Sequence, residues 1–347
     1  MTNDRSPMTE NRMKRLLMSV IVPLLTIAAG AGYASDQTAE EILKAIVKVR
    51  AIIHDDAVTA QSLGTEREGN GVLIDSAGHI LTIGYLILEA KTIEVTDAAG
   101  EVMAATFIGY DHDSGFGLLR VDKDLGIKPM KLGKSSDLKA GDPVLVAAHK
   151  GSGSVAGVRV AARQEFTGYW EYLLENAIYT IPPYQNYGGA ALIGSDGSLL
   201  GIGSLFTRTD VPGFGTLPAN MFVPIDLLKP ILADLIAAGR SQKPPKPWLG
   251  MHTDESHGRV FVIRIHPGGP AQKANLQIGD LVLKVNRQPV SGQADFYRKV
   301  WALGKAGVAV PISILRGTEI QDITVRSDDR YNFLKLDQVI GGKKETL

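Results

Sequence analysis

The sequence predicts a protein built mainly of β-strands in two consecutive sets, followed by a smaller domain that combines strands with a helix. Short apolar or alternating runs recur through 46–121 and again through 144–223, and glycine-containing turns separate many of them. Strands of this length and spacing are typical of sandwiches and barrels. A helix with one apolar side is expected at 225–238, and the Pro-rich polar segment 239–247 is expected to be a stiff linker.

Composition narrows the function classes. The chain has 347 residues, 44% of them hydrophobic, which is enough for two or three packed domains. Its 37 basic and 37 acidic residues cancel, so no charge signature for nucleic-acid binding is present. The absence of cysteine excludes disulfides, thiolate catalysis and cysteine-ligated zinc, and the 7 histidines show no metal-ligand spacing. No cofactor or metal is therefore expected.

Residues 1–34 are expected to be a signal peptide. A basic cluster at 12–15 precedes an apolar run at 16–32, and small residues at 32–34 suit a signal peptidase. Met13 would be a natural start, with 1–12 as an extension. An uncleaved membrane anchor is the alternative, because the run approaches the roughly 20 residues that span a bilayer. Pro23 favours cleavage, and the sequence thus predicts an exported, periplasmic protein.

The two sets of strands are assigned to 35–125 and 126–238. The expected strands are 46–50, 71–74, 80–82, 92–96, 104–108 and 117–121 in the first set, and 144–147, 157–161, 191–193, 199–202 and 221–223 in the second. Within the second set, Gly188 and Gly189 follow Asn186 and Tyr187 and predict a sharp, exposed turn. Tyr187 would stand at its tip, a place where proteins often put a reactive side chain.

Four segments of these two sets, in their order and spacing, resemble the HtrA/Deg family of periplasmic trypsin-like serine proteases. They are 69–82 (GNGVLIDSAGHILT), 109–121 (GYDHDSGFGLLRV), 132–142 (LGKSSDLKAGD) and 221–225 (MFVPI). The resemblance implies an all-β double barrel of the chymotrypsin/trypsin type. It also implies where the family's catalytic residues would fall.

Carried over position by position, the family's histidine falls on Tyr85, its aspartate on Gly115 and its nucleophilic serine on Tyr187. The family's glycine that shapes the oxyanion turn falls on Gln185, and the proline that follows its glycine pair falls on Ala190. Acyl transfer by this route needs a hydroxyl, a base and a carboxylate that orients the base. A phenol with a pKa near 10 is almost fully protonated at neutral pH. The resemblance therefore implies a protein that is not an active protease.

The alternative is a hydrolase that uses substitute residues. Candidates are His112 with Asp113, or Ser152 and Ser154 near His149. The first pair is displaced from the matching turn, and the serines stand in a Gly-Ser loop where serine is ordinary. His79 occupies a hairpin position where a structural role is expected.

The two tyrosines that replace the histidine and serine should lie near each other. Tyr85 and Tyr187 are expected to fill the cleft, or to form a shallow aromatic surface with Tyr184. The alternative is that each ring independently faces solvent.

Residues 248–328 resemble a PDZ domain, which the family places after its barrels. The segments that carry the resemblance are 260–265, 267–271 and 274–286, with a groove helix expected at 294–303 and closing strands at 308–315 and 320–325. A PDZ domain binds an extended peptide by strand addition and captures its terminal carboxylate with backbone N–H groups. The resemblance assigns that capture to Trp248, Leu249, Gly250 and Met251; an ordinary strand start is the alternative.

The sequence thus predicts an exported pseudoprotease of two barrels and an α+β PDZ domain, followed by a polar tail at 329–347 that is frayed at its end. Its expected partners are peptides, unfolded segments or C-termini of envelope proteins, which it would bind as a scaffold, chaperone-like holder or regulator of an active HtrA-type protease. Rival hypotheses are a hydrolase with unorthodox residues and a structural subunit of a membrane-linked complex. Homo-oligomerisation stays open.

Overall fold

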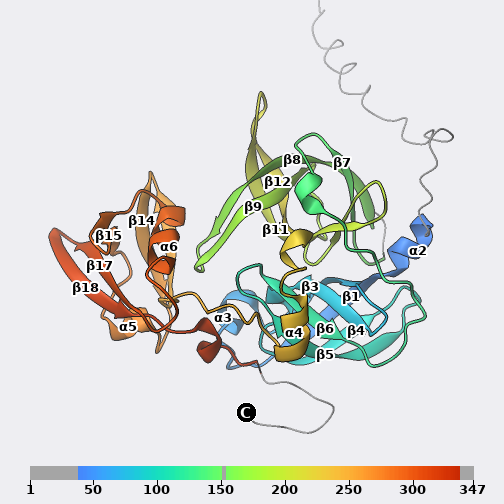
Figure 1. Cartoon of the computed structure of the whole chain (residues 1–347), viewed down its shortest axis with the longest axis horizontal. Helices are drawn as coiled ribbons and strands as arrows, with labels where there is room; N and C mark the ends of the chain where they lie inside the picture. Colours follow the sequence, from blue (N-terminus) through green and yellow to red (C-terminus); the bar gives the residue numbers. More distant parts are fainter. Residues whose placement is uncertain (1–37, 151–153, 337–347) are drawn as a thin grey trace, which may run out of the picture. The chain divides into compact units, whose positions relative to one another are not determined.

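The computed structural model describes residues 38–150 and 154–336, which form two closed barrels and a third sheet (Figure 1). The expected signal peptide, 1–34, lies outside the described residues. Within these ranges no helix has the length and apolar character that crossing a membrane requires.

The first barrel has the strand order β1-β2-β3-β6-β5-β4. Its strands are β1 (Ile46–Ile53), β2 (Glu66–Leu73), β3 (His79–Ile83), β4 (Ala90–Thr96), β5 (Val102–Tyr110) and β6 (Phe116–Arg120), with α2 (Ala39–Lys44), α3 (Ala60–Leu63) and η1 (Gly84–Leu86) between or before them. Thr38 and Glu41 form a capping box that starts α2. Val49, Leu81 and Leu118 are fully buried, as expected for strands that alternate into one core.

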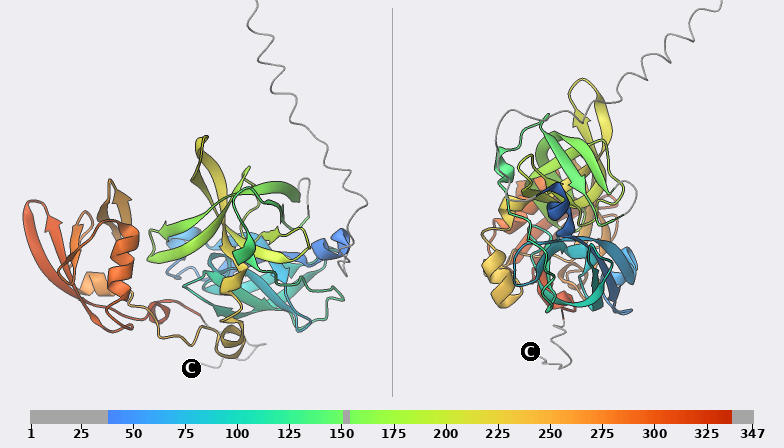
Figure 2. Two further views of the ribbon diagram at one scale, coloured as in Figure 1. Left: turned by 45° about the horizontal axis from the view of Figure 1, so that its top comes forward. Right: turned by 90° about the vertical axis from the view of Figure 1, so that its right-hand side faces the viewer.

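The second barrel has the order β10-β11-β12-β9-β8-β7. Its strands are β7 (Pro143–Ala147), β8 (Val155–Gly168), β9 (Tyr172–Ile181), β10 (Ala191–Ile193), β11 (Leu199–Val211) and β12 (Gly215–Pro224), preceded by η2 (Ser135–Asp137). The sequence predicted most of these strands but missed β9. Strands β8 and β9 form a long antiparallel hairpin that extends beyond the barrel toward the C-terminal domain (Figure 2).

The prediction of one continuous helix at 225–238 is wrong, because the structure has two separate helical segments there. A 3-10 turn, η3 (Ile225–Leu227), is followed by a separate helix, α4 (Leu232–Ala238). Pro230 lies between them, and proline removes a backbone donor and disfavours the helical conformation of the residue before it. Gly239, at φ 72°, ends α4 in the left-handed conformation.

The third sheet has the order β13-β14-β15-β17-β18, with β16 paired to β15. Its strands are β13 (Met251–Ser256), β14 (Arg259–Ile265), β15 (Leu281–Val285), β16 (Gln288–Pro289), β17 (Ala309–Arg316) and β18 (Glu319–Arg326), and its helices are α5 (Pro270–Lys273) and α6 (Gln293–Trp301). Phe296 and Val300 of α6 are buried in one core with Val282 and Ile312 of the sheet. Asn275 adopts φ 59°, the left-handed conformation predicted for it.

The tail beyond residue 328 is anchored at its start, and the end that was predicted to be frayed lies outside the described residues. Residues Arg330–Phe333 form a 3-10 turn, η4. The Tyr331 hydroxyl donates to the Tyr110 carbonyl of the first barrel at 2.9 Å, and the Arg240 guanidinium lies 3.8 Å from the centre of the Tyr331 ring. An aromatic residue with a hydroxyl partner anchors this segment, which composition alone did not indicate.

Candidate functional site

Tyr85 lies in η1, directly after β3, and connects the two barrels. Its hydroxyl donates to the carbonyl of Ser204 on β11 at 2.9 Å. Burial, with a smaller contribution from Tyr187, raises the pKa of the Tyr85 phenol above its usual value. The group is therefore neutral at physiological pH and has no capacity to act as a general base there.

Gly115 contributes only backbone. It adopts φ 81°, and its carbonyl accepts a bond of 2.7 Å from the Gly84 amide. A Cβ atom built on Gly115 would stand 3.1 Å from the Tyr172 hydroxyl, which itself donates to the Ser114 carbonyl. A larger side chain here would thus be strained by its φ and close to an occupied neighbour.

Tyr187 lies before the predicted glycine turn, which is present. Gly189 has φ 73°, and a Cβ on it would lie 1.8 Å from the Asn70 carbonyl oxygen, so no other residue fits without backbone movement. The Tyr187 ring packs against Phe206, with 6.5 Å between the ring centres.

Tyr85, Gly115 and Tyr187 line one cavity of about 530 Å³, so the fold brings the three predicted positions together. Among the ring pairs of the described residues, however, Tyr187 is paired with Phe206 and not with Tyr85. The prediction that Tyr184 joins these tyrosines in a shallow aromatic surface is wrong. Tyr184 is 8% exposed and belongs to a buried cluster of second-barrel residues that includes Val146, Leu192 and Phe222.

His112, a candidate substitute base, is held by structural contacts. Its Nδ1 lies 3.1 Å from the Tyr110 hydroxyl, and its Nε2 lies 3.0 Å from the carbonyl oxygen of Glu171. Burial, together with the nearby Arg330 charge, depresses the pKa of the imidazole well below its usual value. His149 is likewise engaged, with Nε2 2.8 Å from the Asp97 carbonyl oxygen. The candidate Ser152 lies outside the described residues.

The predicted carboxylate-binding segment, 248–251, holds a carboxyl group from the protein itself. Glu171 accepts from the Leu249 amide at 2.9 Å, the Gly250 amide at 2.8 Å and the Met251 amide at 3.2 Å. Gly250 has φ 74°, which turns successive amides toward one point. Trp248 does not join them, because its amide donates to the Asp328 carbonyl at 3.0 Å.

Two family descriptions match the chain: "Trypsin-like peptidase domain" over residues 69–202 and "PDZ domain" over residues 247–326. A protein of Pseudomonas fluorescens named "Probable periplasmic serine endoprotease DegP-like" is 32% identical over 277 residues, which are 74% of this chain and 54% of that protein. The chain belongs to the HtrA/Deg family. It spans about half the length of this curated relative.

Other comparisons agree with this HtrA/Deg assignment. "Protease Do-like 1, chloroplastic" of Arabidopsis thaliana is 28% identical over 79% of this chain and 66% of that protein. The solved structure "HtrA-type protease AlgWS227A with tripeptide" covers 86% of this chain and 98% of its own, with a TM-score of 0.55 and 20% identity. The serine endoprotease from Yersinia pestis gives a TM-score of 0.52 at 22% identity, covering 86% of this chain and 99% of its own. These structures establish the double-barrel and PDZ fold.

Sequence reasoning missed Glu171, whose carboxyl group accepts from three amides of the predicted HtrA/Deg peptide-binding segment. It stands in the turn between β8 and β9, 78 residues before Leu249, and is 3% exposed. Burial raises the pKa of its carboxyl group to about 7, although the three amides and Arg330 act in the opposite direction. No local pattern links this turn to the last domain, so only the tertiary structure could reveal the contact.

Proposed function

We propose that this HtrA/Deg chain is an exported pseudoprotease that binds peptides or protein C-termini through its PDZ groove and does not cleave them. The observation that carries the proposal is the group of amides at Leu249, Gly250 and Met251, which converge on a carboxyl group. Anion capture of this kind is what a PDZ domain needs to bind a terminal carboxylate.

The proposed loss of proteolysis follows from the side chains at the three positions that the resemblance assigns. Tyr85 is a neutral phenol bonded to Ser204, Gly115 has no side chain, and Tyr187 packs on Phe206. None supplies a base for a nucleophile or a carboxylate for a base. Removing such a unit from related enzymes costs about a million-fold in rate, or roughly 8 kcal/mol of barrier.

The proposed role is recognition in the periplasm. Several relatives are named periplasmic serine endoproteases, and four of the similar structures are named as holding a tripeptide or a decapeptide. By analogy, the partner of this chain is an exposed C-terminus or unfolded segment of an envelope protein. The chain would act as a scaffold, as a chaperone-like holder or as a regulator of an active HtrA-type protease.

Three measurements on the full chain test this function. Turnover of fluorescently labelled casein should equal the protein-free control, and a serine-directed phosphonate should leave the chain unlabelled. Turnover that the phosphonate abolishes would instead establish a hydrolase with substitute residues. In parallel, a labelled peptide with an apolar last residue should bind when its C-terminus is free and lose binding when it is amidated. Equal binding of the two peptides would contradict carboxylate capture.

A further inference from the structure

The turn between β8 and β9 places a carboxyl group where a peptide C-terminus would bind. Glu171 has φ 58°, a conformation that is uncommon for a residue other than glycine, asparagine or aspartate. Such a conformation persists only when surrounding contacts hold it. For Glu171 these contacts come mainly from the PDZ domain, through the amides of Leu249, Gly250 and Met251.

The main chain on either side of this turn also contacts the groove. The Thr253 amide of β13 donates to the Tyr169 carbonyl at 2.9 Å, as it would to an added strand. From α6, the Tyr297 hydroxyl donates to the Gly168 carbonyl at 2.8 Å and accepts from the Glu171 amide at 3.3 Å. The turn is therefore bonded to both walls of the groove, the strand β13 and the helix α6.

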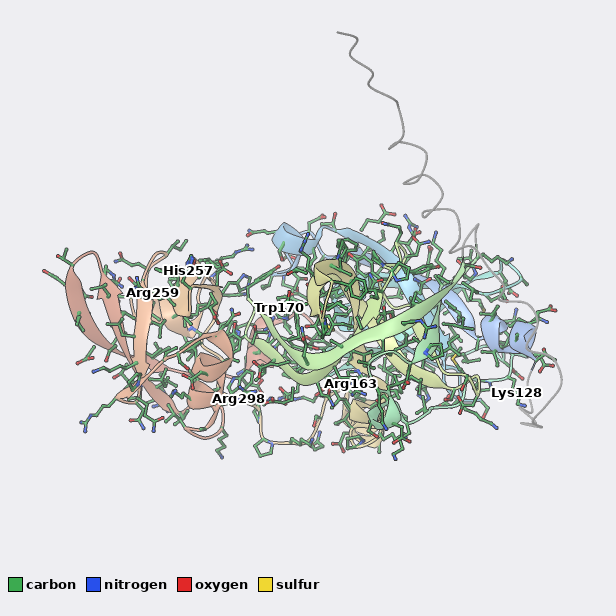
Figure 3. The ribbon with its side chains drawn as sticks, turned by 90° about the horizontal axis from the view of Figure 1, so that it is seen from above. Lys128, Arg163, Trp170, His257, Arg259 and Arg298 are labelled. Atoms are coloured by element: carbon green, nitrogen blue, oxygen red, sulfur yellow. The ribbon has the colours of Figure 1, made fainter. Side chains whose placement is uncertain are left out.

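An apolar side chain completes the match. Leu173 is 8% exposed and belongs to the same buried cluster as Leu249, Met251, Phe296 and Val300 of the PDZ domain, although it lies on β9 of the second barrel. Figure 3 shows Trp170 at the end of the β8–β9 hairpin and Arg298 on the facing helix α6. A carboxyl group in an amide cradle, a strand-type bond and a buried leucine are the same groups that a peptide with an apolar C-terminal residue would present.

We infer that residues 168–173 are a built-in ligand of the PDZ groove, and that a peptide with an apolar last residue and a free carboxylate binds by displacing them. This inference rests on the proposed peptide-binding function and adds its regulation. Because the turn occupies the groove in most molecules, only the small fraction with a released turn can bind peptide. The apparent dissociation constant is therefore the intrinsic constant divided by that fraction. Peptide binding would in turn free the β8–β9 hairpin of the second barrel.

The decisive variant is Glu171→Gly, because glycine adopts the φ of this position without strain and removes the carboxyl group. Its matched control is His257→Gly, which also puts glycine at a left-handed position. His257 has φ 52° and lies in the exposed turn between β13 and β14. The full chain in each form is titrated with a fluorescent decapeptide that ends in leucine, with a free or an amidated C-terminus. We expect Glu171→Gly to lower the dissociation constant for the free peptide at least tenfold, and the control to leave it unchanged.

A second measurement follows the turn itself. Because the chain has no cysteine, Tyr169→Cys provides one labelling site on a side chain that is 46% exposed. Saturating free peptide should increase the accessibility of the attached dye to a soluble quencher, and the amidated peptide should not.

The outcomes separate the two proposals. In one outcome, both the wild type and Glu171→Gly bind the free peptide more tightly than the amidated one, with equal affinities, and the peptide does not change the quenching of the dye. This outcome overturns the built-in ligand and leaves the peptide-binding function standing. Failure of both forms to distinguish free from amidated peptide overturns the function. Tighter binding by Glu171→Gly together with the dye response supports both.

Discussion

The two candidate sites of this chain differ in what builds them. The region around Tyr85, Gly115 and Tyr187 could catalyse acyl transfer only through side chains, because the reaction needs a nucleophile, a base and a carboxylate. The PDZ segment depends on main-chain amides, and it needs only the turn that Gly250 provides. A site made of backbone thus tolerates changes of side chain that would end catalysis in the other.

The protein's own groups also contact the two regions differently. Tyr85 bridges the barrels with a neutral hydrogen bond to Ser204 inside the apolar surroundings of the first region. Glu171 enters the second region as a titratable group that a peptide carboxylate can replace. The first contact is a fixed part of the core, whereas the second is set up for competition.

The largest expected effect comes from changing the backbone of the second region. In Gly250→Val, a β-branched residue would have to adopt φ 74°, and its Cβ would lie 3.1 Å from Pro270 Cδ and 3.2 Å from the Trp248 ring. The left-handed conformation alone costs roughly 1–2 kcal/mol. When Gly250→Val is added to the Glu171→Gly variant, carboxylate-dependent peptide binding should fall more than tenfold. Fluorescence anisotropy measures this binding.

The matched control for this change is Gly258→Val. Gly258 has φ 70°, but a Cβ there would meet only the Ser291 carbonyl, at 3.6 Å. It should show a similar drop in stability in thermal unfolding and keep peptide binding. Equal loss of binding in both variants would mean that strain in the sheet, and not the amide turn, is responsible.

A pH series sharpens the comparison through Glu171. Its pKa is about 7 when inserted, against an ordinary value near 4.5, so the inserted turn binds a proton more tightly than the released turn. Insertion is therefore fully favoured below about pH 4.5 and weakens as the pH rises through 7. Peptide affinity of the wild type should rise on the order of tenfold from pH 5.5 to 8.

Neighbouring groups with a shifted pKa do not titrate in this pH range. Burial raises the pKa of the Tyr297 phenol above its usual value and lowers the pKa of the His112 imidazole well below its usual value, so neither group changes its charge between pH 5.5 and 8. The pKa of His252, on β13, is lowered to about 4. Glu171→Gly should therefore show a flat profile, and a slope equal to that of the wild type would assign the effect to another group.

A smaller effect is expected in the first region. Tyr85→Phe removes the hydrogen bond that the phenol donates to the buried Ser204 carbonyl. This loss should lower the free energy of unfolding by about 1 kcal/mol. Within the described residues, the Tyr187 hydroxyl makes no hydrogen bond to the protein, so Tyr187→Phe is the control and should stay within about 0.5 kcal/mol. Denaturant unfolding measures both, and a reversed order would contradict the bridging role of Tyr85.

The smallest effect is expected at the surface contact beside the groove. Arg298 of α6 (Figure 3) pairs with Glu165 and Glu175 on the β8–β9 hairpin. All three side chains are exposed. Exposed ion pairs contribute less than about 1 kcal/mol and weaken with salt. Arg298→Ala should thus tighten peptide binding by less than about fivefold, and 0.5 M salt should remove the difference.

Much of the fold could be predicted because its signals are local. Turns such as 186–189 and the left-handed Asn275 follow from residue type, and the barrel strands follow from alternation. The break at Pro230 could also have been predicted, since the proline stands inside the expected helix. The site could be predicted only in part, because the amides of 249–251 follow from a motif while their partner Glu171 is brought to them by long-range packing.

The anchoring of residues 329–336 bears on how this chain can be divided for experiments. Tyr331 bonds to the first barrel at Tyr110, and the Lys335 amide donates to the Glu89 carboxylate at 3.1 Å. A version shortened at residue 328 would uncover part of the first barrel as well as remove the last segment. Differences between a shortened and an intact chain would therefore combine two causes, and point substitutions in the full-length protein are the cleaner route.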